Sequence, residues 1–437
     1  MVFAGRYRSG VLLSRRKESM KYDVQKYLDR ARTVYANLAN TQDLFCGCNS
    51  YWKVGNVFDT MTDFLLVSGD SPGTIAADVY RFYKDLKGAC WYDDYGWWGL
   101  ASCKAYNSAY DHIFDVSKSD FQNLAKDTWR FLNKGGNTPS TYGAPNVWKN
   151  CDPYEYFNQP ATWAKPRVEN GVWQYEMFKV AREGDCSSSN PSDPVSCTLG
   201  PFQNTVVNAL YLLLAGRLQA LKVAADPDPR DAFEREYSFL NTWFFMYDPA
   251  SSFERSLIWE IGNGRGWLFR ERVSTYALLP DASEFPKVGA YDEDAAWGGD
   301  QGLLMAGMDE YYKLHNDDTM RFGMALNLVL GVVAKLTIDG VLQPLTLDIG
   351  DADDYMCGPG VFMRYLLSVF NSNPTLKAWL IDSFVKLSPD SNFIYKSAED
   401  ALGIDPNRES DLCRRLFDHF NILSTLTTAY VILGAAN

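Results

Sequence analysis

Helical periodicity is the feature that most constrains how this chain folds. Apolar side chains recur at spacings of three and four over most of its length, which places them on one face of a helix. No series of alternating apolar and polar residues competes with this pattern, so the sequence predicts an all-α fold. The expected helices cover residues 18–40, 51–68, 74–86, 97–110, 119–132, 202–223, 231–247, 302–315, 319–336, 360–370, 376–387 and 411–433.

Three stretches interrupt this pattern without separating two cores. Residues 137–200 are rich in Pro, Gly, Ser, Asn and Trp, and so long a loop inside a compact domain is usually functional. Residues 248–297 are mixed, with room for short strands, and residues 337–356 are expected to be loop. About a dozen helices pairing around a circle would form an (α/α)6 toroid. The inner helices of this single domain would start at one cleft.

The composition argues against several classes of partner. The net charge of −12 and the pI of about 4.9 disfavour nucleic acid and anionic membranes and suit a neutral polysaccharide. No run of 18 apolar residues predicts a membrane span. His112, His315 and His419 lie far apart, which disfavours a histidine-based hydrolase or a histidine-ligated metal. We expect a monomer with no cofactor and no metal.

The N-terminus and the cysteines leave the cellular compartment open. Residues 1–20 are basic, and their one apolar run, Val11-Leu12-Leu13, is too short for the core of a signal peptide. The protein is therefore expected to be cytoplasmic, or secreted with its signal trimmed from this sequence. Cys186 and Cys197 are the best disulfide candidates if it is exported.

The segment 90–101 carries the clearest chemical signal. Its sequence, Cys-Trp-Tyr-Asp-Asp-Tyr-Gly-Trp-Trp-Gly-Leu-Ala, places the adjacent carboxylates Asp93 and Asp94 among five aromatic residues. Glycosidic bond cleavage usually needs two carboxyl groups, and the flat apolar faces of sugars pack on aromatic rings. The segment therefore indicates a carbohydrate site. The alternative is structural: an aspartate caps a helix and the aromatic residues belong to the core.

Four segments resemble, in order, the motifs of glycoside hydrolase family 76, the α-1,6-mannanases. Residues 92–101 resemble Y-D-D-x-x-W-W-x-L-A, the most specific of the four. Residues 203–218 are similar to K-N-x-x-x-N-x-L-x-x-x-L-A-A-R-L. Residues 300–304 are similar to a segment where the family tends to show N-Q-G, and residues 360–366 resemble K-G-I-F-x-R-Y-L.

This resemblance implies an (α/α)6 barrel over residues 21–437, after a basic extension of residues 1–20, and a retaining mechanism. Asp93 matches the nucleophile and Asp94 the general acid/base. Neighbouring Cα atoms are ~3.8 Å apart, so both side chains can meet the ~5–5.5 Å carboxyl separation of retaining enzymes. Along a regular helix they would diverge by about 100°. The pair is therefore expected in the loop or first turn that opens a helix.

The same placement assigns the two acids different protonation states. The start of a helix favours an ionised carboxylate, as the nucleophile must be. The acid must carry a proton, so the pKa of Asp94 has to be raised, which its ionised neighbour and aromatic burial would supply.

Substrate contacts are expected at several helix starts. Trp91, Trp98 and Trp297 are each either a sugar platform or a core residue. Asn204 and Asn208 are four apart and share a helix face, so the alternative for Asn204 is a buried interhelical hydrogen bond. Asp300 stands where the family tends to have Asn, and Gln203 where it tends to have Lys. The substrate-binding set is Trp91, Tyr92, Trp98, Asn204, Trp297, Asp300 and Gln301.

Three function classes follow from these features. The first is a retaining glycoside hydrolase that acts on α-mannosides, α-1,6-mannan or its oligosaccharides. The second is a transglycosidase of the same fold, which transfers the sugar to another sugar, as fungal cell-wall relatives are thought to do. The third is a different (α/α)6 enzyme, or a non-catalytic glycan-binding relative, which would typically have lost one aspartate.

Two other acidic groups have simpler interpretations. The aspartates at 348, 351, 353 and 354 could bind Ca²⁺, but they lack EF-hand spacing, so a solvated loop is favoured. Asp317-Asp318 precedes an expected helix and is interpreted as its N-terminal cap.

Overall fold

The computed structural model describes most of the expected helices. The expected helix at 74–86, the cysteines Cys186 and Cys197 and most of residues 137–200 lie outside the described residues. The described residues are 22–39, 51–71, 92–107, 118–134, 167–169, 172–174, 203–244, 258–261, 266–270, 272–273, 296–346, 353–386 and 389–435.

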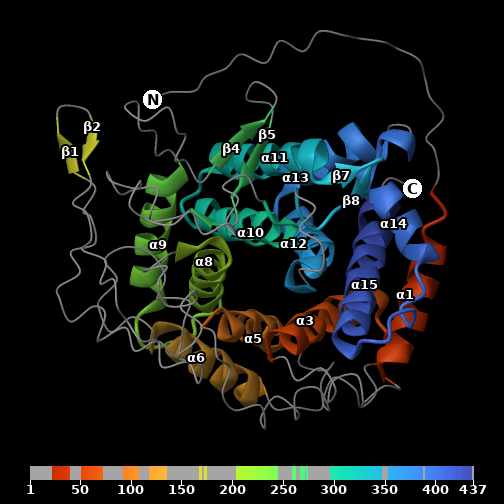
Figure 1. Ribbon diagram of the computed structural model, residues 1–437. Helices are drawn as coiled ribbons and strands as arrows, with labels where there is room; N and C mark the ends of the chain where they lie inside the picture. Colours follow the sequence, from red (N-terminus) through yellow and green to blue (C-terminus); the bar gives the residue numbers. More distant parts are fainter. Residues whose placement is uncertain are drawn as a thin grey trace, which may run out of the picture.

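Six helices form a closed inner ring. Each packs against the next in the order α3, α5, α8, α10, α12, α15, and α15 returns to α3 (Figure 1). The ring explains how helices far apart in sequence share one core. Its members are α3 (Tyr51–Ser68), α5 (Tyr92–Tyr106), α8 (Thr205–Ala220), α10 (Gly298–Leu314), α12 (Gly358–Ser372) and α15 (Leu412–Gly434).

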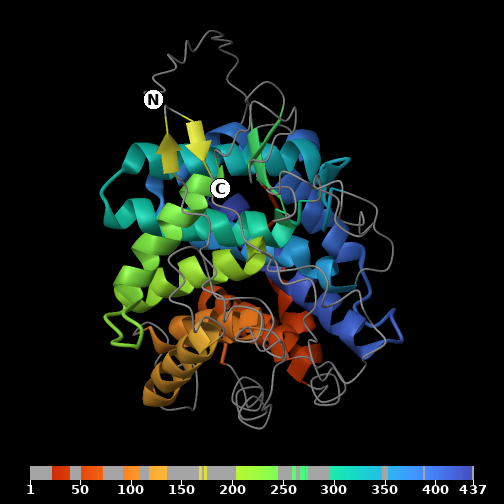
Figure 2. The same cartoon turned by 60° about the vertical axis from the view of Figure 1, so that its left-hand side comes forward.

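A second set of helices packs around this ring. Helix α6 packs on α5, α9 on α8, α11 on α10 and α13 on α12, while α1 and α14 pack on α15 (Figures 1 and 2). The architecture is therefore the expected all-α (α/α)6 barrel. The outer helices are α1 (Gln25–Ala39), α6 (Lys118–Lys134), α9 (Pro229–Phe244), α11 (Asp318–Lys335), α13 (Pro374–Leu380) and α14 (Phe393–Gly403).

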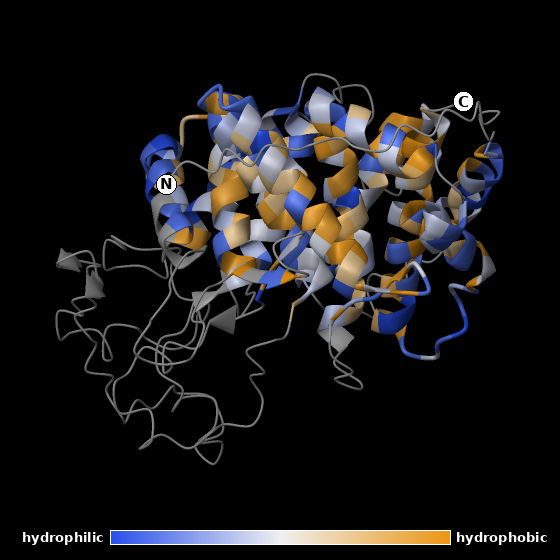
Figure 3. Ribbon diagram, turned by 90° about the horizontal axis from the view of Figure 1, so that it is seen from above, coloured by the Kyte–Doolittle hydropathy of each residue, from blue (hydrophilic) through white to orange (hydrophobic). Residues whose placement is uncertain are grey.

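Sequence composition separates inner from outer helices. Helix α8 is apolar around nearly its whole circumference and is buried along most of its length, as expected for a helix with neighbours on every side. Helix α6 instead alternates apolar with charged residues and presents one polar side. Figure 3 shows apolar and polar residues mixed along the visible helices when the molecule is seen from above.

The inner helices run parallel, so their first turns gather at one end of the ring. Gly360, near the start of α12, donates its backbone N–H to Asn421 of α15 (2.9 Å). Further along both helices, Thr428 of α15 donates to the carbonyl of Met363 in α12 (3.0 Å). Partners thus advance together along both helices. At the same end of the ring, the indole N–H of Trp98 in α5 donates to the carbonyl at the start of α3 (2.7 Å).

Short antiparallel strand pairs lie in the segments that connect the helices, and some of them fall within residues 248–297, where short strands were considered. Each described sheet has two strands, so none of them forms a core. The pairs are β1 (Arg167–Glu169) with β2 (Val172–Gln174), β3 (Gln203–Asn204) with β6 (Arg272–Val273), β4 (Ile258–Ile261) with β5 (Gly266–Phe269), and β7 (Thr337–Ile338) with β8 (Val341–Leu342).

Two sequence expectations were wrong. Residues 337–342 form the β7–β8 hairpin rather than loop, because Asp339 and Gly340 both adopt positive φ (52° and 83°), as a two-residue hairpin turn requires. Helix α14 was not expected. Asn392 caps it by accepting hydrogen bonds from two backbone N–H groups of its first turn. The interpretation of Asp317 as a cap is confirmed, since it accepts from Met320 N (3.0 Å).

The β4–β5 hairpin lies directly on the backbone of α11, which yields a test of the packing. A Cβ on Gly331 would sit 1.9 Å from the carbonyl oxygen of Trp267, whereas one on Gly323 of the same helix meets nothing within 4 Å. We expect Gly331→Ala to lower the free energy of unfolding by about 1–3 kcal/mol or more. Gly323→Ala should raise it by roughly 0.5–1 kcal/mol. Urea unfolding measures both, and equal effects would contradict this packing.

A buried carboxyl group on α9 makes stability depend on pH. Glu236 is 1% exposed, and neither of its oxygens has a hydrogen-bond partner among the described residues. Burial raises its pKa well above the ordinary value of 4.5, and Arg235 offsets this only in part. Its contribution to stability is therefore fully present below about pH 4.5 and is lost as pH rises through the raised folded-state pKa.

We expect Glu236→Gln to stabilise the protein at pH 7 by at least about 1 kcal/mol, because no buried charge then needs to form. The difference from wild type should shrink toward pH 4, where the wild-type carboxyl is protonated in both states. Thermal unfolding across this pH range checks it. A variant less stable than wild type at pH 7 would show that the group has an unrecognised partner.

Candidate active site

The aspartate pair lies in the first turn of an inner helix, as predicted. Helix α5 begins at Tyr92, so Asp93 and Asp94 are its second and third residues. Asp94 is buried, with 7% of its surface exposed. The start of a helix favours a carboxylate, because unpaired N–H groups and the helix dipole point toward it. Trp91 and the side chains of Tyr92 and Asp93 lie outside the described residues.

Trp97 continues the face of α5 that carries Asp94, since residues three apart on a helix are neighbours. Its ring packs edge-to-face on Trp297, which directly precedes α10 (6.4 Å between centroids, 84° between planes). It also contacts Trp52 of α3 (6.3 Å between centroids). Helices α5 and α10 are not neighbours in the ring, so the contact between Trp97 and Trp297 crosses its interior. Asp94 therefore lies one turn from an aromatic cluster inside the ring.

Trp98, the next residue, is turned by about 100° around the helix axis, into the packing between α3 and α5. It is fully buried, and its ring stacks with Phe58 (5.7 Å between centroids). Its indole N–H is occupied by the carbonyl of Tyr51 (2.7 Å). Of the two interpretations of Trp98, sugar platform or core, the structure places it in the core.

The start of α10 brings the other expected residues to the same end of the ring. Trp297 precedes this helix and is 4% exposed, and its N–H donates to the carbonyl of Tyr355 (2.9 Å). Asp300 is fully buried in the first turn. The side-chain amide of Gln301 accepts from Phe269 N (2.8 Å) and donates to Phe269 O (2.9 Å). Gln301 therefore joins α10 to strand β5.

The start of α8 lies between those of α5 and α10. Asn204 belongs to strand β3, whose backbone pairs with β6, and its side chain lies outside the described residues. Thr205 opens α8 and donates its hydroxyl to the carbonyl of Arg270 (2.6 Å), directly after β5. The end of β5 thus connects the starts of α8 and α10. Asn208 is buried one turn further along α8.

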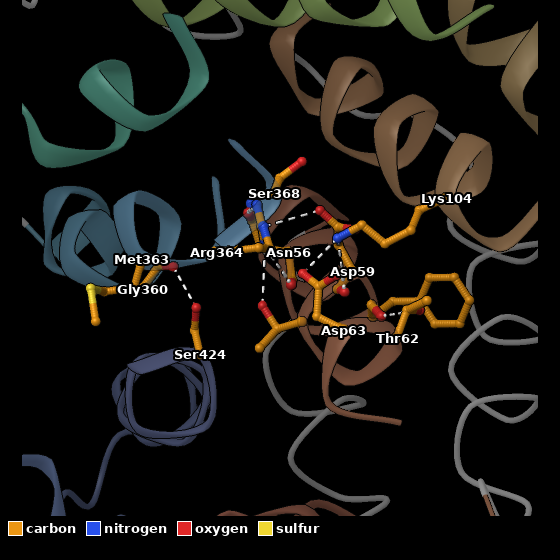
Figure 4. Close-up of polar contacts among 12 residues, drawn as sticks. Asn56, Asp59, Thr62, Asp63, Lys104, Gly360, Met363, Arg364, Ser368 and Ser424 are labelled. Carbon is orange, nitrogen blue, oxygen red and sulfur yellow. Dashed lines mark hydrogen bonds and ion pairs between the residues drawn. The ribbon is translucent and has the colours of Figure 1, made fainter. Parts of the chain in front are cut away.

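A charged network connects α3, α5 and α12 (Figure 4). Arg364 of α12 reaches α3, where its Nη1 donates to Asn56 O (3.0 Å) and Thr60 Oγ1 (3.1 Å). Its Nη2 donates to Asn56 Oδ1 (2.7 Å), and its Nε lies 3.1 Å from Asp59 Oδ2. Lys104, in the last turn of α5, places its Nζ 2.6 Å from Asp59 Oδ1. One carboxylate thus joins three inner helices.

Electrostatics keep this network charged. Burial alone would raise the pKa of Asp59, but Lys104 and Arg364 offset it, so the pKa of this carboxyl lies below its ordinary value. Burial alone would lower the pKa of Arg364, and the Asp59 carboxylate raises it above its ordinary value. Burial raises the pKa of Asp63, although Lys104 lies 2.7 Å away. Asp59 and Arg364 therefore form a true buried ion pair.

Arg217 extends the polar interior to two further helices. From α8 it pairs with Glu310 of α10 (3.2 Å) and donates to Ser368 Oγ of α12 (2.9 Å). All five inner helices other than α15 thus contribute to the polar interior.

Trp97 and Arg364 are among the residues of this region that were not in the predicted site. Both stand in the quoted motifs, but only position in the fold shows that they meet: the guanidinium carbon lies 6.0 Å from the centroid of the Trp97 ring. The available signal was charge at a helical core position. Arg364 and Asp59 each interrupt an apolar stripe in their helix.

The structure does not test the interpretation of the acidic group at 348–354. Asp353 and Asp354 open the 3-10 helix η4 (Asp353–Cys357), but their side chains and the other two aspartates of that group lie outside the described residues. Across the described part of the chain, no cluster of three metal-ligating side chains occurs.

Within the same part, no helix has the length and apolar character needed to cross a membrane.

Comparison with solved structures decides the fold. The GH76A α-1,6-mannanase of Salegentibacter sp. HEL1_6 is similar with a TM-score of 0.55 at 14% identity, covering 93% of this chain and 99% of that one. Dfg5 from Chaetomium thermophilum, in complex with glucosamine, is similar with a TM-score of 0.56 at 14% identity, covering 94% and 92%. The fold is that of the family 76 α-1,6-mannanases. No protein-family model and no curated protein matches the sequence.

The family 76 fold extends over nearly the whole chain in these comparisons. The α-mannanase BT2949 from Bacteroides thetaiotaomicron, also of family 76, has a TM-score of 0.51 at 12% identity and covers 93% of this chain. An inactive form of the Salegentibacter mannanase, changed from Asp to Asn at two adjacent positions, is in complex with α-1,6-mannotriose. It covers 92% of this chain at 13% identity, with a TM-score of 0.55.

Proposed function

We propose that this protein is a retaining glycoside hydrolase of α-mannosides, acting on α-1,6-mannan or its oligosaccharides. The observation that carries the proposal is the adjacent pair Asp93-Asp94 in the first turn of inner helix α5 of a family 76 fold. A neighbour with the same fold is inactive when two adjacent aspartates become asparagine, and that protein binds α-1,6-mannotriose.

The chemistry divides between the two carboxyl groups. Asp93 attacks the anomeric carbon while Asp94 protonates the glycosidic oxygen, and the leaving sugar departs as a covalent glycosyl-enzyme forms. Asp94, now ionised, removes a proton from water, and the water oxygen replaces Asp93 at the anomeric carbon. Two inversions give net retention. The α5 helix start supports the carboxylate charge that the nucleophile needs.

The sugar-contacting residues in this proposal come from the helix starts. Trp91, Tyr92, Asn204, Trp297 and Asp300 are assigned to substrate binding. Trp98 packs between α3 and α5, and Gln301 is bonded to the backbone of β5, so both are assigned to supporting the site from behind.

The likeness to Dfg5 in its glucosamine complex favours one second candidate. In that candidate the glycosyl-enzyme is passed to a sugar hydroxyl rather than to water. The first half of the reaction and both aspartate roles are the same, so only the acceptor differs.

Product analysis tests both candidates. The protein is incubated with α-1,6-mannobiose, mannotriose and mannotetraose, with α-1,2- and α-1,3-mannobiose as linkage controls, and the products are separated by chromatography. Shorter products from the α-1,6 series alone support the hydrolase. Products longer than the substrate support the transglycosidase. No change in any of these sugars would contradict the proposed substrate.

A further inference from the structure

Arg364, in the interior of the ring, is held by several hydrogen bonds and an ion pair. Arg364 is 2% exposed. Its side chain extends from α12 to α3, although α15 stands between these two helices in the order of the ring. Three N–H···O bonds and one ion pair, all to residues of a single turn of α3, fix its guanidinium plane. A planar fork held at both Nη atoms cannot rotate, unlike a lysine ammonium on a flexible stem.

The fixed guanidinium lies among three aromatic rings, those of Tyr365 (4.9 Å from its carbon to the centroid), Phe420 (5.6 Å) and Trp97 (6.0 Å). The distance to Trp97 is at the outer limit of a cation–π contact. Trp52 and Trp297 touch the same ring from α3 and α10. Trp97 is therefore enclosed by residues of three other inner helices, and it is 3% exposed.

Trp297 is itself locked in place. A Cβ on Gly299 would lie 2.3 Å from its ring, and one on Gly358 would lie 2.8 Å from its indole nitrogen. The indole N–H is bonded to the carbonyl of Tyr355. Both glycines are therefore needed for this tryptophan to occupy its position. Trp97 thus packs between two immobile groups, Arg364 and Trp297.

We propose that Arg364 is a positioning residue that sets the first turn of α5, and with it Asp93 and Asp94, by holding Trp97 from below. Trp97 lies three residues after Asp94 on the same helix face, so a shift of its ring tilts the turn that carries the pair. The inference rests on the proposed function for its kinetic consequences. Its structural consequence is independent of substrate.

The main test replaces Arg364 with lysine, which keeps the charge but cannot hold Asn56 and Thr60 at the same time. A misplacement of about 1 Å can cost around 10²-fold in rate. We therefore expect kcat to fall roughly 10–100-fold while KM changes less than about threefold. The matched control is Arg217→Lys, a second arginine of the ring interior whose described contacts are Glu310 and Ser368. That change should leave kcat within about twofold of wild type.

Coupling to Trp97 separates positioning from general stability. In a double-mutant cycle with Trp97→Phe and Arg364→Lys, the losses in kcat should be strongly non-additive, because both changes release the same turn. Additive losses, or an equal loss in Arg217→Lys, would overturn the proposal.

Hydrogen exchange gives a readout that needs no substrate. In Arg364→Lys, the amides of Gly96 through Leu100 should exchange at least about tenfold faster than in wild type, and those of α11 should not change. Unchanged exchange in α5 would overturn the inference. Faster exchange in a protein that cleaves no α-mannoside would support the inference and contradict the proposed function. If Arg364→Lys does not fold, Thr60→Val, which removes one of the guanidinium's acceptors, takes its place with the same expected directions.

Discussion

Replacing either aspartate of the pair with asparagine is expected to abolish cleavage of α-1,6-mannooligosaccharides. In the proposed mechanism Asp93→Asn removes the nucleophile, so no glycosyl-enzyme can form. Asp94→Asn removes the proposed proton transfer to the leaving oxygen, a step that by itself contributes about 10²–10⁴-fold. Steady-state rates on α-1,6-mannotriose measure both losses. The matched control is Asp318→Asn, which changes a first-turn aspartate of outer helix α11 whose side chain is 86% exposed.

An activated substrate separates the two roles. A dinitrophenyl α-mannoside has a leaving group that departs without protonation, so Asp94→Asn should still form the glycosyl-enzyme and release a burst of dinitrophenol. Asp93→Asn should release none. Added azide should restore turnover in Asp94→Asn, because this anion needs no general base. A burst in Asp93→Asn and none in Asp94→Asn would reverse the assignment, and full activity in either variant would remove that residue from the mechanism.

The second large effect concerns stability. Asp59→Asn should lower the free energy of unfolding by about 3–5 kcal/mol, because Arg364 and Lys104 would keep their buried positive charges without the shared carboxylate. The exposed pair of Asp382 with Lys386 is the control, and Asp382→Asn should cost less than about 1 kcal/mol. Guanidinium unfolding at pH 7 measures both.

This ion pair also predicts how stability falls in acid. The pKa of Asp59 is lowered in the folded protein, so its contribution is present above its ordinary pKa near 3.8 and is lost as pH falls through the lower folded value. The gap in stability between wild type and Asp59→Asn should therefore narrow below about pH 4. A gap that stays constant to pH 2, or no gap at pH 7, would show that Asp59 is not a buried charged partner.

Much of the fold could be predicted because helical periodicity survives in a single sequence. The pattern of α3 locates its bounds, Tyr51–Ser68, since its apolar residues follow one another at helical spacing up to Gly69. Helix α14 was not predicted, because it has only 11 residues, too few for helical periodicity to be distinguished. Its Asn392 cap and closing Gly403 were the signals present. The Asp339-Gly340 pair likewise marked the β7–β8 hairpin.

The acidic pair of the candidate site could be predicted from the sequence, but the contacts between distant residues around it could not. The pair Asp93-Asp94 stands out as adjacent acids before a helical pattern, and the first turn of α5 is where it lies. Nothing in the spacing of Trp97 and Trp98 says which one faces the ring interior, because both lie on apolar positions. The contact of Arg364 with Asp59 joins residues 305 positions apart in the chain, so only the closed ring reveals it. Tertiary packing, which local pattern does not encode, decides these positions.

The most direct measurement is the anomeric form of the first product. Proton NMR during cleavage of α-1,6-mannotriose by the wild-type protein should show the α-anomer of the newly formed reducing end before mutarotation, as two successive inversions require. The β-anomer as first product would contradict the adjacent pair as nucleophile and acid. It would place the reaction with enzymes whose two carboxyl groups stand about 6.5–9.5 Å apart around a water molecule.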